Sequence, residues 1–104
     1  MTSSFDAAAV ADIPPGRGKT VEFLGRRYAL FNVEGTFHAI DDACPHRGAS
    51  MGEGWCDGRT VHCPLHGWTF DIPSGACLTR PDRPVNPYPA EVREGRVWIH
   101  VPKP

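Results

Sequence analysis

The stretch Asp42–Cys77 reads DACPHRGASMGEGWCDGRTVHCPLHGWTFDIPSGAC, and two short phrases within it, CPH at 44–46 and CPLH at 63–66, share one layout. Each has a Cys followed by a Pro, then a His, with a Gly one or two residues further on. Pro fixes φ and Gly permits a left-handed or closely approached backbone, so both phrases can form tight loops whose side chains converge. The candidate metal ligands are Cys44, His46, Cys63 and His66.

The segment around these phrases, residues 43–79, is dense in Gly, Cys, His and Pro and poor in aliphatic side chains. We therefore expect a metal centre, in place of an apolar core, to hold this segment together. A zinc finger with two cysteines followed by two histidines does not fit, because the order here is Cys, His, Cys, His and no helical stretch carries the histidines.

The flanking sequence has the period of two that is typical of strands. The segments RRYALFNV and TFHAID, at 26–33 and 36–41, alternate on either side of Glu34-Gly35 and predict a hairpin. A second hairpin is expected from Ala90 to Val101 around Glu94-Gly95, and KTVEFLG supplies a further strand. The proline-rich segment RPDRPVNPYP reads as an extended connection. Eleven Gly and eleven Pro leave little room for helices.

The chain as a whole, 104 residues with a net charge of -1, fits one domain and has no basic footprint for nucleic acid or for a membrane surface. No run approaches the roughly 18 apolar residues that span a bilayer, and the N-terminus lacks the pattern of a signal peptide. We expect a cytoplasmic location, where thiols stay reduced and four cysteines favour metal ligation over two disulfides.

These motifs resemble the Rieske [2Fe–2S] proteins, whose pattern is C-x-H, then a spacer, then C-x-x-H. Here 16 residues separate His46 from Cys63. The resemblance extends through CPHRGASM and CPLHGWTFDIPSGAC, and the flanking hairpins match the strand order of the family.

The resemblance implies an all-β fold, a Rieske-type antiparallel β-sandwich or barrel with a small cluster-binding subdomain of two ligand loops. Residues 1–104 would form a single domain. Its basal sheets would comprise residues 1–42 and 80–104, and its cluster-binding subdomain residues 43–79.

The resemblance also implies one [2Fe–2S] cluster, with Cys44 and Cys63 on the inner iron and His46 and His66 on the outer iron. Members with high potentials carry an extra Cys in each loop and a Ser after the second loop. This chain has Ala49, Leu65 and Trp68 at those places. With fewer donors to stabilise the added electron, we expect a potential of about -150 to 0 mV.

A chain this short has no room for a mononuclear iron domain and carries no Gly-rich nucleotide fingerprint. We therefore predict an electron carrier, and not an enzyme. It would take one electron from an NAD(P)H-dependent reductase to a terminal oxygenase of the aromatic-ring dioxygenase type. We expect a monomer that docks transiently through the His46 and His66 tip.

The sequence is compatible with other interpretations. The same family includes the small subunit of assimilatory nitrite reductase, which would stay bound to a large partner, whereas a ferredoxin would act alone. Other classes are a structural zinc module and a thiol redox sensor using Cys56 and Cys77, which we expect to be free thiols. The remaining histidines are predicted to be ordinary strand residues that do not ligate metal: His38, His62 and His100.

Overall fold

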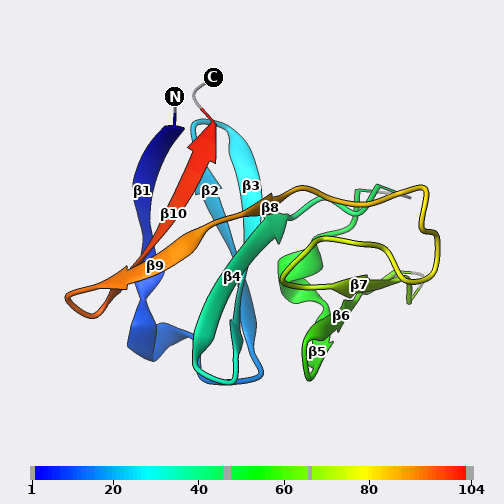
Figure 1. Cartoon of the computed structure of the whole chain (residues 1–104), viewed down its shortest axis with the longest axis horizontal. Coiled ribbons are helices and arrows are strands. Elements are labelled where there is room, and N and C mark those ends of the chain that lie inside the picture. The colour runs from blue at the N-terminus through cyan, green and yellow to red at the C-terminus, as the bar shows by residue number, and fades with distance from the viewer. Residues whose placement is uncertain (1, 46–47, 66, 103–104) are drawn as a thin grey trace.

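The computed structural model describes residues 2–45, 48–65 and 67–102. The regular secondary structure of these residues consists of strands and two short 3-10 helices (Figure 1). The N-terminal part contains β1 Thr2–Ala9, η1 Val10–Asp12, β2 Gly18–Phe23, β3 Arg26–Val33 and β4 Thr36–Asp41. The middle contains η2 Met51–Glu53, β5 Trp55–Asp57, β6 Thr60–His62 and β7 Thr69–Asp71. The C-terminal part contains β8 Pro87–Tyr88, β9 Ala90–Arg93 and β10 Arg96–Pro102.

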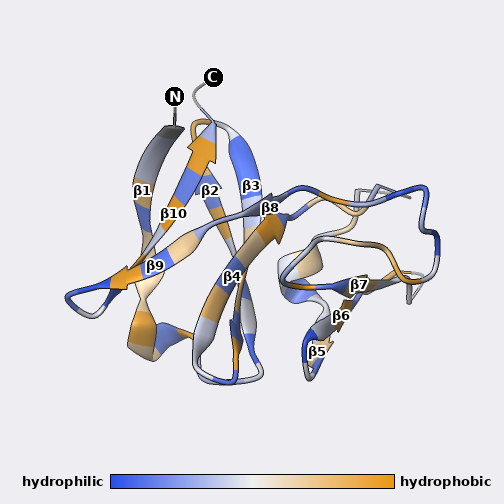
Figure 2. Ribbon diagram, in the orientation of Figure 1, coloured by the Kyte–Doolittle hydropathy of each residue, from blue (hydrophilic) through white to orange (hydrophobic). Residues whose placement is uncertain are grey.

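The strands of the described residues form three antiparallel sheets, ordered β1-β10-β9, β2-β3-β4-β8 and β5-β6-β7. This arrangement confirms the predicted all-β antiparallel fold. The two-residue turns at Glu34-Gly35 and Glu94-Gly95 have positive φ at both positions, as type I′ hairpins require. Both hairpins predicted from the sequence are therefore present, and the β9–β10 turn is hydrophilic (Figure 2).

The central strand β3 is buried on both faces, which explains the nearly continuous apolar run YALF in its sequence. Tyr28 and Leu30 pack in a first apolar cluster together with residues of the β1-β10-β9 sheet, such as Ile99. Ala29 and Phe31 point the other way and pack in a second cluster with residues of the middle of the chain. The four-stranded sheet thus separates two cores.

The second apolar cluster corrects the expectation that a metal centre replaces the core of the middle segment. Met51, Val61, Phe70 and Ile72 are fully buried there and pack with Phe31 of β3. Few aliphatic residues are needed, because the aromatic rings of Phe31 and Phe70 fill much of the volume of this cluster.

Strand β1 is a feature that the sequence pattern did not indicate. It pairs antiparallel with β10 in a register from Thr2↔Pro102 to Ala9↔Arg96, with a shift between Asp6 and Ala8. The bulge leaves Ala7 out of the ladder and brings both Phe5 and Ala8 into the first core. A run of alanines has low strand propensity, so tertiary pairing decides the structure of this segment.

Candidate metal centre

Two equivalent hairpin loops carry the paired Cys and His phrases. The first Cys-His loop, residues 44–49, is flanked by the bridge Ala43↔Ser50, and the second Cys-His loop, residues 63–68, by the pair His62↔Thr69 of β6 and β7. Each loop therefore holds six residues between two antiparallel partners. The repeated phrases of the sequence correspond to one repeated backbone construction.

Both loops are closed by the same two backbone hydrogen bonds. In the first, Cys44 N–H donates to Ala49 C=O (2.9 Å), and Gly48 N–H donates to Cys44 C=O (2.7 Å). In the second, Cys63 N–H donates to Trp68 C=O (2.7 Å), and the Gly67 N–H donates back to the Cys63 C=O (2.9 Å). The glycines have φ of +70° and +72°, a left-handed backbone that L-residues rarely adopt.

The cysteines of the two loops are buried and share one apolar environment. Cys44 is 2% exposed and Cys63 is 1% exposed, and both belong to the second apolar cluster. Two thiols on equivalent loops, shielded from water and brought into one cluster, fit the thiolate half of an iron–sulfur site. His46 and His66, the other two predicted ligands, lie outside the described residues.

The other three histidines lie on strands, as predicted, and are engaged in contacts of their own. The ring of His62 stacks on Trp55 at a centroid distance of 4.6 Å, and its Nδ1 lies 3.1 Å from Thr69 Oγ1. His100 Nε2 lies 2.7 Å from Glu91 Oε1. Burial, and then the nearby charge of an arginine, lowers the pKa of His38. His62 and His100 are thus held by contacts of their own, and the expectation that none of the three binds metal stays a prediction.

The two remaining cysteines, Cys56 and Cys77, form no disulfide, in agreement with the expectation of free thiols. Cys77 is buried, and its Sγ accepts a hydrogen bond from the Arg80 N–H (3.2 Å). Cys56 is half-buried, and this burial raises the pKa of its thiol, opposed by the charge of Arg17. The thiol of Cys56 therefore lacks the lowered pKa that marks a reactive cysteine.

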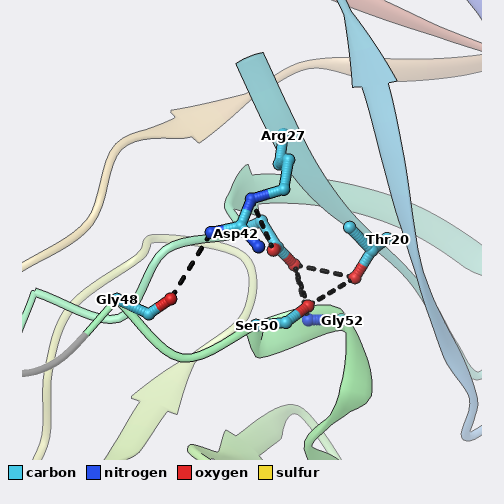
Figure 3. A network of polar contacts seen from close by, with 6 residues as sticks. All are labelled: Thr20, Arg27, Asp42, Gly48, Ser50 and Gly52. Atoms are coloured by element: carbon cyan, nitrogen blue, oxygen red, sulfur yellow. Dashed lines mark hydrogen bonds and ion pairs between the residues drawn. The ribbon is translucent and has the colours of Figure 1, made fainter. Parts of the chain in front are cut away.

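A polar network at the base of the first Cys-His loop was not singled out from the sequence. Asp42, which precedes Ala43 and Cys44, is fully buried and is hydrogen-bonded to Thr20 and Ser50 (Figure 3). The alternation of β4 contained a signal for it, because Asp42 follows the buried Ile40 by two residues and so falls on the same face. A buried carboxylate requires hydrogen-bond partners, and the partners of Asp42 make up this network.

Comparison with known proteins agrees with this geometry. The family described as Rieske [2Fe-2S] domain matches residues 3–89. The chain therefore belongs to the Rieske [2Fe–2S] family, and one [2Fe–2S] cluster is its cofactor. This assignment removes the alternative of a structural zinc module.

One similar protein is the ferredoxin component of the naphthalene 1,2-dioxygenase/salicylate 5-hydroxylase systems of Ralstonia sp. It is 38% identical over 101 residues, which cover 95% of this chain and 97% of that protein. The structure is also similar to a chain in a complex of reduced oxygenase and oxidised ferredoxin in carbazole 1,9a-dioxygenase. That match has a TM-score of 0.88 and 32% identity, and it covers 97% of this chain and 95% of the other.

A third similar structure comes from Mycobacterium tuberculosis and is named for the small subunit of an NADH-dependent nitrite reductase. It has a TM-score of 0.89 and 33% identity, covering 100% of this chain and 99% of that chain. Within the described part of this chain, no helix is long and apolar enough to cross a membrane.

Proposed function

We propose that this protein is the ferredoxin component of a multicomponent oxygenase system of the aromatic-ring dioxygenase type. It would accept one electron from an NAD(P)H-dependent reductase and pass it to the terminal oxygenase. The observation that carries the proposal is the end-to-end similarity to the Ralstonia ferredoxin component, at 38% identity over 97% of that protein. This chain therefore aligns with nearly the whole length of such a ferredoxin component.

We propose that Cys44 and Cys63 bind one iron as thiolates and that His46 and His66 bind the other through their imidazoles. The burial of both cysteines and the equivalence of the two loops support this set. When bound, the cluster supplies a site that takes up and releases one electron. The chain contributes the shielding of both thiolates from water and the closure of both loops around them. In this arrangement residues 43–79 form the cluster-binding part of a single domain, on a base built from 1–42 and 80–104.

The proposed docking surface is the tip formed by the two Cys-His loops. Leu65, next to His66, is 60% exposed there, and Leu78 is exposed as well. Trp68 is partly buried and lies under the guanidinium of Arg80, at 5.6 Å from Cζ to the ring centroid. A few apolar side chains beside a cation suit brief redox contacts, which have small interfaces. We propose a cytoplasmic monomer that exchanges partners through this surface.

A second candidate function is that of a nitrite reductase small subunit, because the Mycobacterium tuberculosis structure matches the whole chain with a TM-score of 0.89. The fold does not separate the two, since the carbazole dioxygenase complex matches almost equally well. Sequence favours the ferredoxin, because ferredoxin components of two dioxygenase systems are 38% and 41% identical to this chain.

The test is electron transfer by the purified chain. Anaerobically reduced protein is first expected to show an electron paramagnetic resonance spectrum of the Rieske type, with a lower average g than a four-cysteine cluster. The protein is then mixed with a dioxygenase reductase, NADH and a terminal oxygenase of the same class. Substrate-dependent NADH oxidation that requires this chain supports the proposal. A protein that is stable only in complex with a nitrite reductase large subunit, and that transfers no electrons to the oxygenase, contradicts it.

A further inference from the structure

Asp42 is a buried carboxylate at the base of the first Cys-His loop, and one of its oxygens is saturated with donors. Its Oδ1 accepts hydrogen bonds from Thr20 Oγ1 (2.9 Å), Ser50 Oγ (3.0 Å) and the Gly52 N–H (2.8 Å) (Figure 3). Thr20 and Ser50 hydroxyls also lie 2.7 Å apart. Three donors on one oxygen fit an ionised carboxylate, because such a group accepts without donating.

The network depends on the close approach of η2 to β2, which brings Gly52 next to Thr20. Gly52 packs so closely against β2 that a Cβ at this position would lie 2.6 Å from the Thr20 backbone nitrogen. Only glycine therefore lets the Gly52 N–H reach the buried carboxylate. The main chain adds to the attachment, because the Met51 N–H donates to the Asp42 C=O (2.7 Å).

The second oxygen of Asp42 faces a guanidinium. Among the described residues Oδ2 has no hydrogen-bond partner, and Arg27 Nε lies 3.7 Å from it. The same guanidinium reaches the first Cys-His loop, since Arg27 Nη2 donates a long hydrogen bond to the Gly48 C=O (3.4 Å). Gly48 is the residue that closes the loop onto Cys44. Figure 3 shows Arg27 between Asp42 and Gly48.

Among the described residues, the second Cys-His loop has no such pair at the equivalent places. By the common hydrogen-bond pattern, Val61 corresponds to Asp42 and Thr69 corresponds to Ser50. Val61 is fully buried and apolar, and Thr69 Oγ1 contacts His62. In the part of the chain that the structure describes, buried charge therefore lies beneath the first loop, two residues before its cysteine.

We propose that the two members of the Asp42–Arg27 ion pair, beneath the first loop, shift the reduction potential of the metal centre in opposite directions. The inference rests on the proposed ligand Cys44. Reduction adds a negative charge, which a buried carboxylate nearby opposes and a guanidinium favours. Arg27 thus offsets the effect of Asp42, and it also holds Gly48. Because Asp42 is out of water, its interaction with charge at the centre is weakly screened. Asp42 and Arg27 act in this role through their charges and are not ligands of the centre.

The experiment is a redox titration of the holoprotein, followed by its visible spectrum, for Arg27→Gln, Asp42→Asn and the double variant. The neighbouring pair provides the control. Arg26 precedes Arg27 on the same strand and lies 3.9 Å from Asp41, but its side chain is more exposed, at 66% against 46%. We expect Arg27→Gln to shift the potential to a more negative value and Asp42→Asn to shift it to a more positive one. The double variant should return toward the unmodified protein, while Arg26→Gln should shift the potential much less than Arg27→Gln.

The variants separate charge from structure. Arg27→Lys keeps the charge, so the reduction potential of this variant should stay close to that of the unmodified protein, even where the contact with Gly48 is loosened. Equal shifts for Arg26→Gln and Arg27→Gln would overturn the proposal, as would a negative shift for Asp42→Asn. Arg27 is half-exposed, so its variants test the proposal even if Asp42→Asn does not fold. Absence of a Rieske spectrum in the unmodified protein would instead refute the ligand set, and the two failures are therefore distinguishable.

Discussion

The glycines that close the two Cys-His loops allow a prediction whose size follows from the structure. At Gly48 and Gly67 an added Cβ would have no described atom within 4 Å, so an alanine meets no steric clash. The cost comes from the positive φ alone, about 1–2 kcal/mol for an L-residue. The alanine also restricts the conformations of the unfolded chain, which offsets about 0.4–1 kcal/mol of this cost. We expect each alanine variant to lower the free energy of unfolding by about 1 kcal/mol.

Gly58 is the matched control, because it also has open space and a positive φ but lies in the β5–β6 turn, away from both cysteines. Urea unfolding of the holoprotein should give a similar loss for Gly48→Ala, Gly67→Ala and Gly58→Ala. Only the two loop variants should also release iron to a chelator faster, since they disturb the closure onto Cys44 and Cys63. A loss above about 3 kcal/mol, which requires a named clash or cavity, or a gain in stability, would refute the reasoning.

Three further results are expected. Phe70→Ala should cost about 3–5 kcal/mol in urea unfolding, since this ring is fully buried in the second core; a loss under 1 kcal/mol would show that this core contributes little. Burial, and then the hydrogen bond to Asp41, raises the pKa of Tyr88 to about 12, so stability should fall between pH 10 and 12 as the unfolded phenol loses its proton first, and Tyr88→Phe should remove this fall. Removal of iron should accelerate amide hydrogen exchange in the peptides that carry Gly48 and Gly67, measured by mass spectrometry, and unchanged exchange would contradict metal-dependent order of the loops.

The strands that could be predicted from the sequence have one feature in common. In β4 and β10 alternate residues face a core, and positive-φ turn residues join each hairpin, so local pattern and tertiary structure agree. Strand β1 has no such pattern, because its alanines take their conformation from pairing with β10. Local propensity carries no information about a partner that lies about ninety residues away.

The site was predictable to the extent that it is built from local phrases. The Cys-Pro and His-Gly layout indicates two equivalent loops, and the hydrogen bonds of Cys44 and Cys63 confirm that equivalence. The support of the loops is not local. Asp42 meets Thr20 and Arg27 from two different strands, and the local sequence carries no information about these partners. The packing of β2, β3 and η2 shows both that Asp42 is buried and which partners it meets.

The two loops are equivalent in backbone but differ in what holds them, and this difference is testable. Thr20→Val leaves Asp42 one donor short, at a cost of about 1–3 kcal/mol, and should act on the first loop. Val61→Ala removes apolar contacts beneath the second loop, at a cost of about 2 kcal/mol.

The amides of Gly48 and Gly67 report on the two loops separately, since each donates the hydrogen bond that closes its own loop. Native-state hydrogen exchange should therefore accelerate at Gly48 in Thr20→Val and at Gly67 in Val61→Ala. Equal acceleration of both amides in both variants would mean that the loops open as one unit. In that case the polar network and the second apolar cluster would belong to a single cooperative structure, and the separate attachment of the loops argued above would be wrong.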